Sequence, residues 1–168
     1  MIALSTPRLT LREFLTHDAA ELYLLNKDPE VLRYTGDLPY RNIEEALTFI
    51  NSYDQYAKYK TGRLAMILKK THAFVGWCGL KYHPETGETD LGFRLKKEFW
   101  NRGLATEASI ACIDYGFKVL KLEAIVGRAL KANSASVKVL KKVGMKFSRD
   151  FDFEGEPGVL FILENKAE

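Results

Sequence analysis

The segment from Trp100 to Thr106, with the sequence WNRGLAT, carries the clearest sign of ligand chemistry in the chain. It lies between a predicted strand and a predicted helix, and the small residues Gly103 and Ala105 would let a ligand approach the backbone closely. Free N–H groups and the helix dipole at a helix N-terminus form a site for an anion such as a pyrophosphate. A tight turn that needs glycine is the alternative interpretation. The segment is neither a Walker loop, because no Gly-Lys-Ser/Thr follows, nor a dinucleotide fingerprint, because the third glycine is absent.

The histidines and cysteines show no pattern typical of a metal or disulfide site. His17, His72 and His83 fall in or beside predicted turns, and no two of them are spaced as metal ligands usually are. Cys78 and Cys112 stand in apolar contexts and are too few for a disulfide framework or a zinc site. We therefore expect the histidines at the surface and predict no metal cofactor.

The anion-binding segment needs a strand before it and a buried helix after it, and the periodicity of the chain predicts both. In the helix expected over 103–120, Glu107, Asp114 and Lys118 recur at helical spacing, so they form one polar stripe on an otherwise apolar helix. Such a helix packs against a sheet. Alternating residues over 64–68, 74–82 and 91–95 predict three strands, which we expect to form an antiparallel meander.

The other elements are predicted from caps, turns and period. Asp18 and Glu21 are spaced as a capping box, and Asn42 is expected to cap a longer helix. Further strands are expected over 8–14, 122–129, 147–153 and 159–163, and helices over 18–26, from Pro29, over 42–57 and over 133–143, the last ended by Gly144. The order of these elements predicts a mixed α/β sheet covered by helices.

Composition narrows the class of protein. The chain has 168 residues, of which 46% are hydrophobic and 28% charged, so we expect a single folded domain over 1–168 and no disordered or fibrous architecture. The net charge of +3 is too small for a dedicated nucleic-acid binder, although it suits a small polyanionic ligand. The longest uncharged stretch, 71–80, is too short to span a membrane, and no secretory signal is visible. We therefore expect a cytoplasmic protein that binds neither nucleic acid nor membranes.

Three stretches besides WNRGLAT point to one family. They are RLTLR at 8–12, LGFRL at 91–95, and Asn133 with Ser136 followed by VLKKVGM at 139–145. In this order and spacing they resemble the GNAT superfamily of acyl-CoA-dependent N-acyltransferases, whose first strand, fourth strand, pyrophosphate loop and second cofactor-contacting helix carry such patterns. The resemblance covers nearly the whole chain and is to the RimJ/RimL-like branch of the superfamily.

The resemblance implies a mixed α/β (α+β) fold with a central, mostly antiparallel, twisted sheet of about seven strands flanked by about four helices. Two positions depart from the family pattern. Trp100 replaces the common Gln or Arg at the first position of the loop, as it often does in the RimJ/RimL-like branch. Leu140 replaces a tyrosine that in many members gives the departing thiolate its proton, and leucine has no proton to give.

The resemblance also implies an acetyltransferase that moves an acetyl group from acetyl-CoA to a primary amine by direct attack, through a tetrahedral oxyanion. A backbone N–H in the strand 93–95 would polarise the thioester carbonyl while that strand pairs with the pantetheine arm. Asn133 would contact the pantetheine, and a plain helix N-cap is its alternative role. The residues expected to bind acetyl-CoA are Phe93, Arg94, Leu95, Asn101, Arg102, Gly103, Leu104, Ala105, Thr106 and Asn133.

The catalytic side chains are less well defined by the sequence. Because Leu140 cannot act, we expect Ser136 to give the proton to the leaving thiolate, unless it only bonds a backbone group of its helix. Glu88 or Asp90 is the candidate general base, with Glu13 a further carboxylate that could face the cleft. An exposed carboxylate at a sheet edge is the alternative for each. The need for a base depends on the acceptor, because an α-amine with a pKa of about 8 is partly neutral at pH 7 whereas a lysine amine at about 10.4 is not.

The acceptor is the most open question. Tyrosines near the early helices would line its binding wall, with Tyr34 and Tyr40 the candidates and packing of the rings the alternative for both. We expect a protein N-terminus, such as that of a ribosomal protein, as the acceptor. A small-molecule amine (a polyamine, an amino acid or a drug) is the alternative within the enzyme class, and a non-catalytic acyl-CoA-binding module is the rival outside it. The chain is expected to be a monomer or a homodimer.

Overall fold

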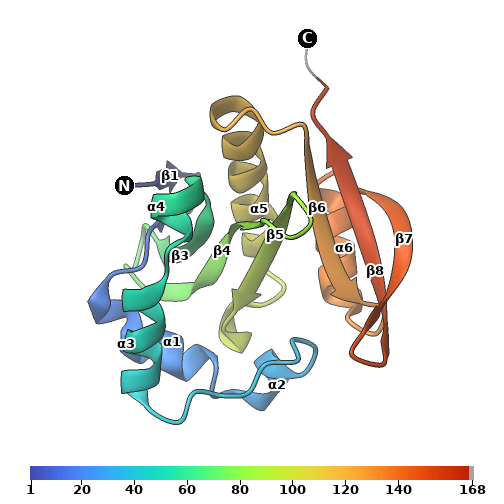
Figure 1. The fold of residues 1–168 in the computed structure, drawn as a ribbon. Coiled ribbons are helices and arrows are strands. Elements are labelled where there is room, and N and C mark those ends of the chain that lie inside the picture. The colour runs from blue at the N-terminus through green and yellow to red at the C-terminus, as the bar shows by residue number, and fades with distance from the viewer. Residues whose placement is uncertain (167–168) are drawn as a thin grey trace.

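One mixed sheet runs through the computed structural model, which describes residues 1–166 (Figure 1). Its eight strands lie in the order β1-β2-β3-β4-β5-β6-β8-β7. The strands are β1 (Ala3–Ser5), β2 (Leu9–Arg12), β3 (Gly62–Leu68), β4 (Phe74–His83), β5 (Glu88–Leu95), β6 (Ala124–Leu130), β7 (Lys146–Phe153) and β8 (Glu156–Glu164). Every neighbouring pair is antiparallel except β5 and β6, which are parallel.

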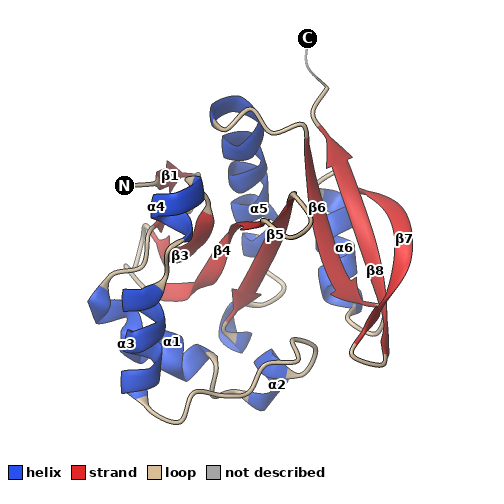
Figure 2. Cartoon of the chain, viewed as in Figure 1, coloured by secondary structure: helices blue, strands red, loops and turns tan. Residues whose placement is uncertain are grey.

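Helices cover both faces of this sheet (Figure 2). They are α1 (Ala19–Leu25), α2 (Pro29–Leu32), α3 (Ile43–Ser52), α4 (Gln55–Tyr59), α5 (Leu104–Asp114) and α6 (Ser134–Lys142), and a π-helical turn over Tyr115–Val119 prolongs α5. Helices α5 and α6 pack on one face, and α1 and α3 pack on the other. In chain order α5 follows β5 and α6 follows β6, so each helix of this face begins near the C-terminal end of one of the two parallel strands.

The alternation of strand residues supplies a core to each face. Leu64 and Met66 point to the α5 side of β3, whereas Ala65 between them points to the α1 side. On β4, Cys78 belongs to the α5 core and Trp77 to the α1 core. Burial on both faces explains why β4 is apolar almost without interruption from Phe74 to Leu80.

The expected class of fold is confirmed, including the antiparallel meander of β3, β4 and β5. The sheet of the described residues has eight strands rather than about seven, because the chain before residue 13 forms two short strands instead of one. The helix expected over 42–57 is also interrupted. Tyr53 has extended backbone angles, φ −74° and ψ 111°, and α4 begins afresh after Asp54.

The expected capping box of Asp18 and Glu21 is wrong. The Asp18 carboxylate accepts hydrogen bonds from the Leu15 N–H (2.7 Å) and from the Arg12 guanidinium (2.7 and 3.0 Å). Its partners therefore precede it in the chain, and it caps no N–H group of α1. Asn42, by contrast, caps α3 as expected, since its side chain accepts from the Glu45 N–H at 3.0 Å. No helix in residues 1–166 is long and apolar enough to cross a membrane.

Candidate active site

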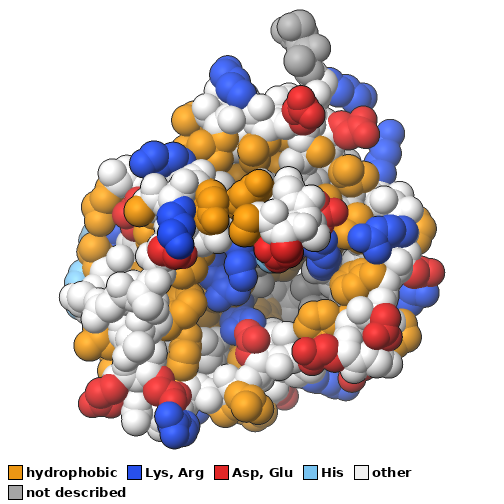
Figure 3. Space-filling view, in the orientation of Figure 1, with side chains coloured by type: hydrophobic (Ala, Val, Ile, Leu, Met, Phe, Trp, Pro, Cys, Tyr) orange, Lys and Arg blue, Asp and Glu red, His pale blue; other side chains and the backbone are white. Residues whose placement is uncertain are grey.

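Strands β5 and β6 pair along only a short stretch. The paired residues are Asp90 with Val126 and Leu91 with Gly127, and the pairing stops there. Beyond Leu91 the strands diverge, so the sheet opens between their C-terminal ends (Figure 1). Figure 3 shows the surface hollowed near the middle of this face, with side chains of both charges around the hollow. Ligands of α/β sheets commonly bind outside the carboxyl ends of strands where neighbours separate.

The backbone of Phe93 faces this opening. The Lys96 N–H donates to a carbonyl of β4 at 2.9 Å, and alternate residues of a strand direct their backbone groups to the same edge, so Arg94 also faces β4. Phe93 and Leu95 therefore direct their N–H and C=O groups toward the opening. The Leu95 carbonyl accepts a hydrogen bond from the Trp100 indole at 2.9 Å. Of the expected strand residues, Phe93 is thus the best placed to bond a ligand lying in the opening.

The predicted anion segment forms the start of α5. Asn101 and Gly103 have left-handed φ angles of 60° and 76°, which turn the chain sharply into the helix, and Leu104 is buried in the core behind it. The Glu107 N–H is bonded to the Gly103 carbonyl at 3.0 Å, so the three N–H groups before it have no acceptor within the helix. A Cβ added at Gly103 would meet only Arg8, at 3.5 Å, so the space beside the loop is open. This geometry fits a pyrophosphate.

Arg8 holds the loop in place, a role that the sequence did not indicate. Its guanidinium donates to the Arg102 carbonyl at 2.9 Å and to the Glu107 carboxylate at 3.2 Å. Glu107 alone would repel a phosphate at the helix start, and the Arg8 cation offsets that charge. The two residues come from opposite halves of the chain, so no local spacing could have revealed the contact.

Asn133 and Ser136 form one unit at the start of α6. The Asn133 Oδ1 accepts from the Ser136 N–H at 3.2 Å, and the Asn133 Nδ2 donates to the Ser136 Oγ at 2.9 Å. The Ser136 oxygen is the acceptor in this pair, which leaves its own O–H free to donate. In residues 1–166 no backbone carbonyl takes that proton, whereas the Ser52 hydroxyl donates to the Thr48 carbonyl at 2.8 Å. The unit directly follows β6, at the end where the sheet opens.

Leu140 lies in the core and not at the site. Its side chain is 1% exposed, and it fills the space above Gly127, where an added Cβ would lie 2.7 Å from it. The position at which the resemblance implies an acid tyrosine is therefore used here for packing against β6.

The two carboxylates expected as bases share one partner. Glu88 and Asp90 both bond the Arg128 guanidinium, Asp90 at 2.8 Å. Burial raises the pKa of Asp90 above its ordinary value even though Arg128 opposes the shift. All three side chains lie on the α1 face beside the opening. Arg128 was missed because a lone arginine in a strand carries no sequence signal of its own.

Two expectations for titratable residues are wrong. Glu13 accepts a hydrogen bond from the Ile2 N–H at 2.9 Å, near the far edge of the sheet, so it does not face the opening. His83 is not an ordinary surface residue, since its side chain is 25% exposed and its Nε2 lies 3.8 Å from Asp90. His17 and His72 are exposed as expected. Within residues 1–166 no three His, Cys, Asp or Glu side chains gather as a metal would require.

Residues 8–146 match the family model described as the acetyltransferase (GNAT) domain. The chain belongs to the GNAT acetyltransferases. This GNAT chain is 32% identical over 148 residues to the "uncharacterized N-acetyltransferase p20" of Bacillus licheniformis, which covers 87% of this chain and 83% of the relative. It also resembles the structure of a GNAT-family acetyltransferase from Bacillus anthracis, with a TM-score of 0.86, 22% identity, and coverage of 99% and 100% of the two chains.

A further GNAT structure holds coenzyme A. It is RimL, titled a ribosomal L7/L12 alpha-N-protein acetyltransferase, and it matches with a TM-score of 0.84 at 13% identity over 99% of this chain and 100% of RimL. These likenesses confirm the family, the fold and the enzyme class expected from the sequence, that of an acetyl-CoA-dependent N-acetyltransferase. At such low identity the RimL likeness itself speaks for the fold alone.

The tyrosines of this GNAT domain divide into two groups. Tyr53 and Tyr56 hold the backbone of β3, because the Arg63 N–H donates to the Tyr53 hydroxyl at 2.8 Å and the Tyr56 hydroxyl donates to the Arg63 carbonyl. Tyr40 lies on the α1 face, where burial raises its pKa while the nearby arginines oppose the shift. Tyr34 lies under the Arg33 guanidinium, 5.0 Å from its ring centroid. Of the two acceptor candidates, Tyr40 is the one among charged groups of the hollowed face.

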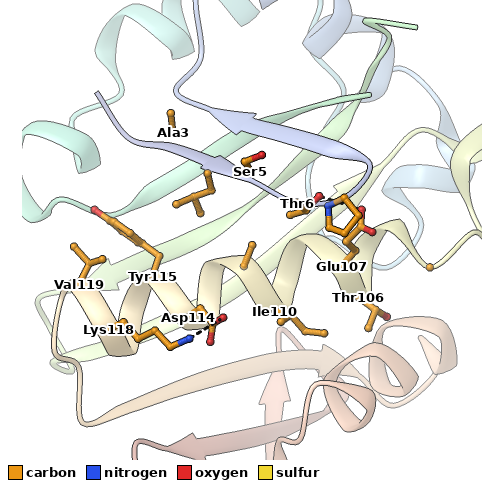
Figure 4. A pocket seen from close by; sticks show the side chains of 14 residues that line it. Ala3, Ser5, Thr6, Thr106, Glu107, Ile110, Asp114, Tyr115, Lys118 and Val119 are labelled. Carbon is orange, nitrogen blue, oxygen red and sulfur yellow. Dashed lines mark hydrogen bonds and ion pairs between the residues drawn. The ribbon is translucent and has the colours of Figure 1, made fainter. Parts of the chain in front are cut away.

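A second depression lies on the other side of α5. It is a groove of about 800 Å³ between β1 and α5, lined by Thr106, Glu107, Ile110 and Val119 among others (Figure 4). The groove touches Gly103 at one end but runs along the β1 side of the helix, away from the opening beside β6. Its lining includes neither Phe93 nor Ser136 nor the two candidate bases.

Proposed function

We propose that this chain transfers the acetyl group of acetyl-CoA directly to a primary amine held on the α1 face of the sheet, beside the opening between β5 and β6. One observation carries the proposal. The divergence of the strands, the free backbone groups of Phe93, and the starts of α5 and α6 all lie at the same end of the parallel pair. Acetyl-CoA in the opening would find, within one region, an N–H for its thioester carbonyl, a site for its pyrophosphate and a proton donor for its thiolate.

The residues there fit acetyl-CoA as a substrate. The pyrophosphate would bond the N–H groups at the start of α5, in the turn made by Asn101, Arg102 and Gly103. The pantetheine arm would run along the free edge of Phe93 and past Asn133. Arg94 and Leu95 would contribute less than expected, because the Arg94 backbone faces β4 and the Leu95 carbonyl is bonded to Trp100.

Each chemical step has a residue to serve it. The Phe93 N–H would stabilise the tetrahedral oxyanion formed when the amine attacks. Ser136 would give the departing thiolate its proton, since its O–H is free and Asn133 fixes its oxygen. Asp90 is the better base of the two candidates, because a raised pKa makes a carboxylate a stronger base. It lies about 10 Å along β5 from Phe93 by strand geometry, so the proton would pass through water.

For the acceptor we propose the α-amine of a protein N-terminus, with ribosomal proteins as the model. The RimJ/RimL-like motifs of the sequence support this choice, and RimL, which shares the fold, is titled an alpha-N-protein acetyltransferase. An α-amine also needs less help from a base to lose its proton than a lysine amine does, which suits Asp90, because the Arg128 cation offsets part of its charge. Action in the cytoplasm, as a monomer or a homodimer and without a metal, stays a prediction of the sequence.

A panel of amines tests the proposal. Thiol release from acetyl-CoA should depend on peptides with a free N-terminus, and mass spectrometry should find the acetyl group on the α-amine. The matched control is the same peptide with a blocked N-terminus and a free lysine. Polyamines and drug amines form the small-molecule arm. Coenzyme A binding with no amine-dependent thiol release would instead support the non-catalytic module.

A further inference from the structure

Two arginines flank Trp77 on the α1 face, beside the proposed acceptor site. The Arg63 guanidinium lies 4.3 Å from the indole centroid and the Arg94 guanidinium 5.4 Å from it. The indole is 6% exposed and lies over Gly92, where an added Cβ would be 3.3 Å from the ring. Gly92 thereby makes room for the indole, and the indole holds both cations at defined places next to β5.

The charge of Arg94 is compensated within the chain. Its Nη1 donates to the Asn26 side chain at 2.8 Å and its Nη2 to the Asp37 carboxylate at 2.6 Å. The Arg94 side chain is 9% exposed, and burial lowers its pKa while Asp37 opposes that shift. Asp37 shows that a carboxylate can enter this part of the α1 face and bond a guanidinium there.

Arg63 has no such partner. In the described chain its guanidinium forms neither an ion pair nor a hydrogen bond, and its close neighbours are the rings of Trp77 and Phe49. No side-chain nitrogen there is both buried and unbonded, so the Arg63 nitrogens reach solvent. Its backbone is fixed by Tyr53 and Tyr56, as described above. A half-buried, positioned and unpaired guanidinium is suited to bind an anion with little loss of side-chain entropy.

We propose that Arg63 binds a carboxylate of the acceptor, so that the preferred substrate is an amine carrying an acidic group in the same molecule. This inference rests on the proposed acetyltransferase function. A carboxylate is favoured over a second amine at this position because Arg63 is an unpaired cation, whereas the carboxylates Glu88, Asp90 and Asp37 of this face are already paired with Arg128 and Arg94. Polyamines, which carry only cations, would be repelled by Arg63 and would bind poorly.

The sheet sets the separation between the two groups of the acceptor. Arg63 is on β3 and the opening borders β5, two strand spacings or roughly 10 Å away, while the guanidinium leans over Trp77 of the intervening strand. The carboxylate must therefore stand several bonds from the reacting amine. An acidic side chain beside a peptide N-terminus and the carboxylate of a long ω-amino acid both meet this condition. The α-carboxylate of a simple amino acid, one carbon from its amine, does not reach.

Two matched pairs of acceptors test the inference. The first pair is a peptide amide beginning Ala-Glu and its Ala-Gln counterpart, and the second is 6-aminohexanoate and 6-aminohexanamide. For wild type, Arg63→Gln and the control Arg33→Gln, kcat/KM is measured for each acceptor, and Kd is measured by calorimetry with coenzyme A present. Arg33 is the matched control because it is an exposed arginine that also lies over an aromatic ring.

Wild type should prefer the acidic member of at least one pair by about tenfold or more, as a charged hydrogen-bonded pair allows. Arg63→Gln should bring that ratio close to one by weakening only the acidic member, whereas Arg33→Gln should keep it. A merely structural change would also alter kcat/KM and Kd for the amide members, so unchanged values for these acceptors exclude it. Should Arg63→Gln unfold, Arg63→Met keeps the packing on Trp77 and should give the same loss of preference.

The two hypotheses fail in different ways. An acid-to-amide ratio of one in wild type, or a ratio unchanged by the loss of Arg63, overturns the role of Arg63. If no probe is acetylated but the Kd ratio depends on Arg63, the transferase proposal is wrong and the recognition of an acid stands. The pair that shows the preference identifies a peptide or a small molecule as the source of the carboxylate.

Discussion

Replacing Ser136 by alanine removes the hydroxyl that we propose as the proton donor to the departing thiolate. The change is local, because the N-cap bond from the Ser136 N–H to the Asn133 Oδ1 uses the backbone and survives. The Asn133 Nδ2 loses its acceptor, but both residues are half-exposed and water can replace the bond. The stability cost should stay below about 1 kcal/mol.

The effect on rate follows from the chemistry of the leaving group. A positioned acid contributes roughly 10² to 10⁴ in rate, and a thiol with a pKa of about 8.5 already leaves fairly well as an anion, so the low end applies. Ser136→Ala should lower kcat about a hundredfold, or about 2.7 kcal/mol in activation free energy. Affinity for coenzyme A should hardly change, because the lost interaction is made only in the transition state.

The assay is thiol release at saturating acetyl-CoA and amine, in single-turnover mode so that chemistry limits the rate. Ser134→Ala is the control, an exposed serine in the same first turn of α6. The loss caused by Ser136→Ala should shrink as the pH rises past the thiol pKa, since the anion then needs no proton. A variant that keeps more than about a third of the wild-type kcat, or a Ser134→Ala variant that loses as much, would refute the assignment.

Three further predictions concern the phosphate site and the base. Gly103→Val should weaken coenzyme A binding at least tenfold by calorimetry, because a β-branched residue at a φ of 76° strains the loop by about 1–3 kcal/mol; unchanged affinity removes the loop from the site. Arg8→Ala should weaken coenzyme A binding about three- to tenfold, because the negative charge of Glu107 is then left uncompensated. The difference from wild type should shrink at high salt, since the Debye length falls to about 3 Å at 1 M. The pH profile of kcat/KM should rise through an inflection above the ordinary pKa of an aspartate, because Asp90 has a raised pKa and must be ionised to act as a base. Asp90→Asn should abolish that limb, and a limb that persists would exclude Asp90.

The sequence predicted best what local rules decide. The meander, the starts of α2 at Pro29 and of α5, and the cap at Asn42 depend on residues a few positions apart, and all of them are present. The capping box failed because other groups competed for the same carboxylate. Asp18 has the spacing of a capping residue, yet a bidentate bond to Arg12 draws its carboxylate away from α1.

The same distinction separates the two halves of the candidate site. The half that we propose for acetyl-CoA is made of short consecutive segments, such as the turn into α5 and the Asn133–Ser136 unit, so their spacing is visible in the sequence. The acceptor half joins Arg63, Trp77 and Arg94 from three strands with Asp37 from a loop. Each of these residues, taken alone, reads as an ordinary strand or loop residue, and only the pairing of β3, β4 and β5 brings them together.

This division has a consequence for how the specificity of the enzyme can change. In our proposal the acetyl-CoA half depends on the backbone of β5 and on the starts of α5 and α6, which must keep their geometry for the thioester to lie in the opening. The proposed acceptor half depends on side chains that point to the α1 face, where the Trp77 ring supports them. Arg63 can therefore be replaced without disturbing Phe93 or the phosphate site, since Tyr53 and Tyr56 hold only its backbone. Substitution at Arg63 should accordingly change which amine is acetylated while leaving coenzyme A affinity as it is, and a parallel loss of both would show that the two halves are coupled through the sheet.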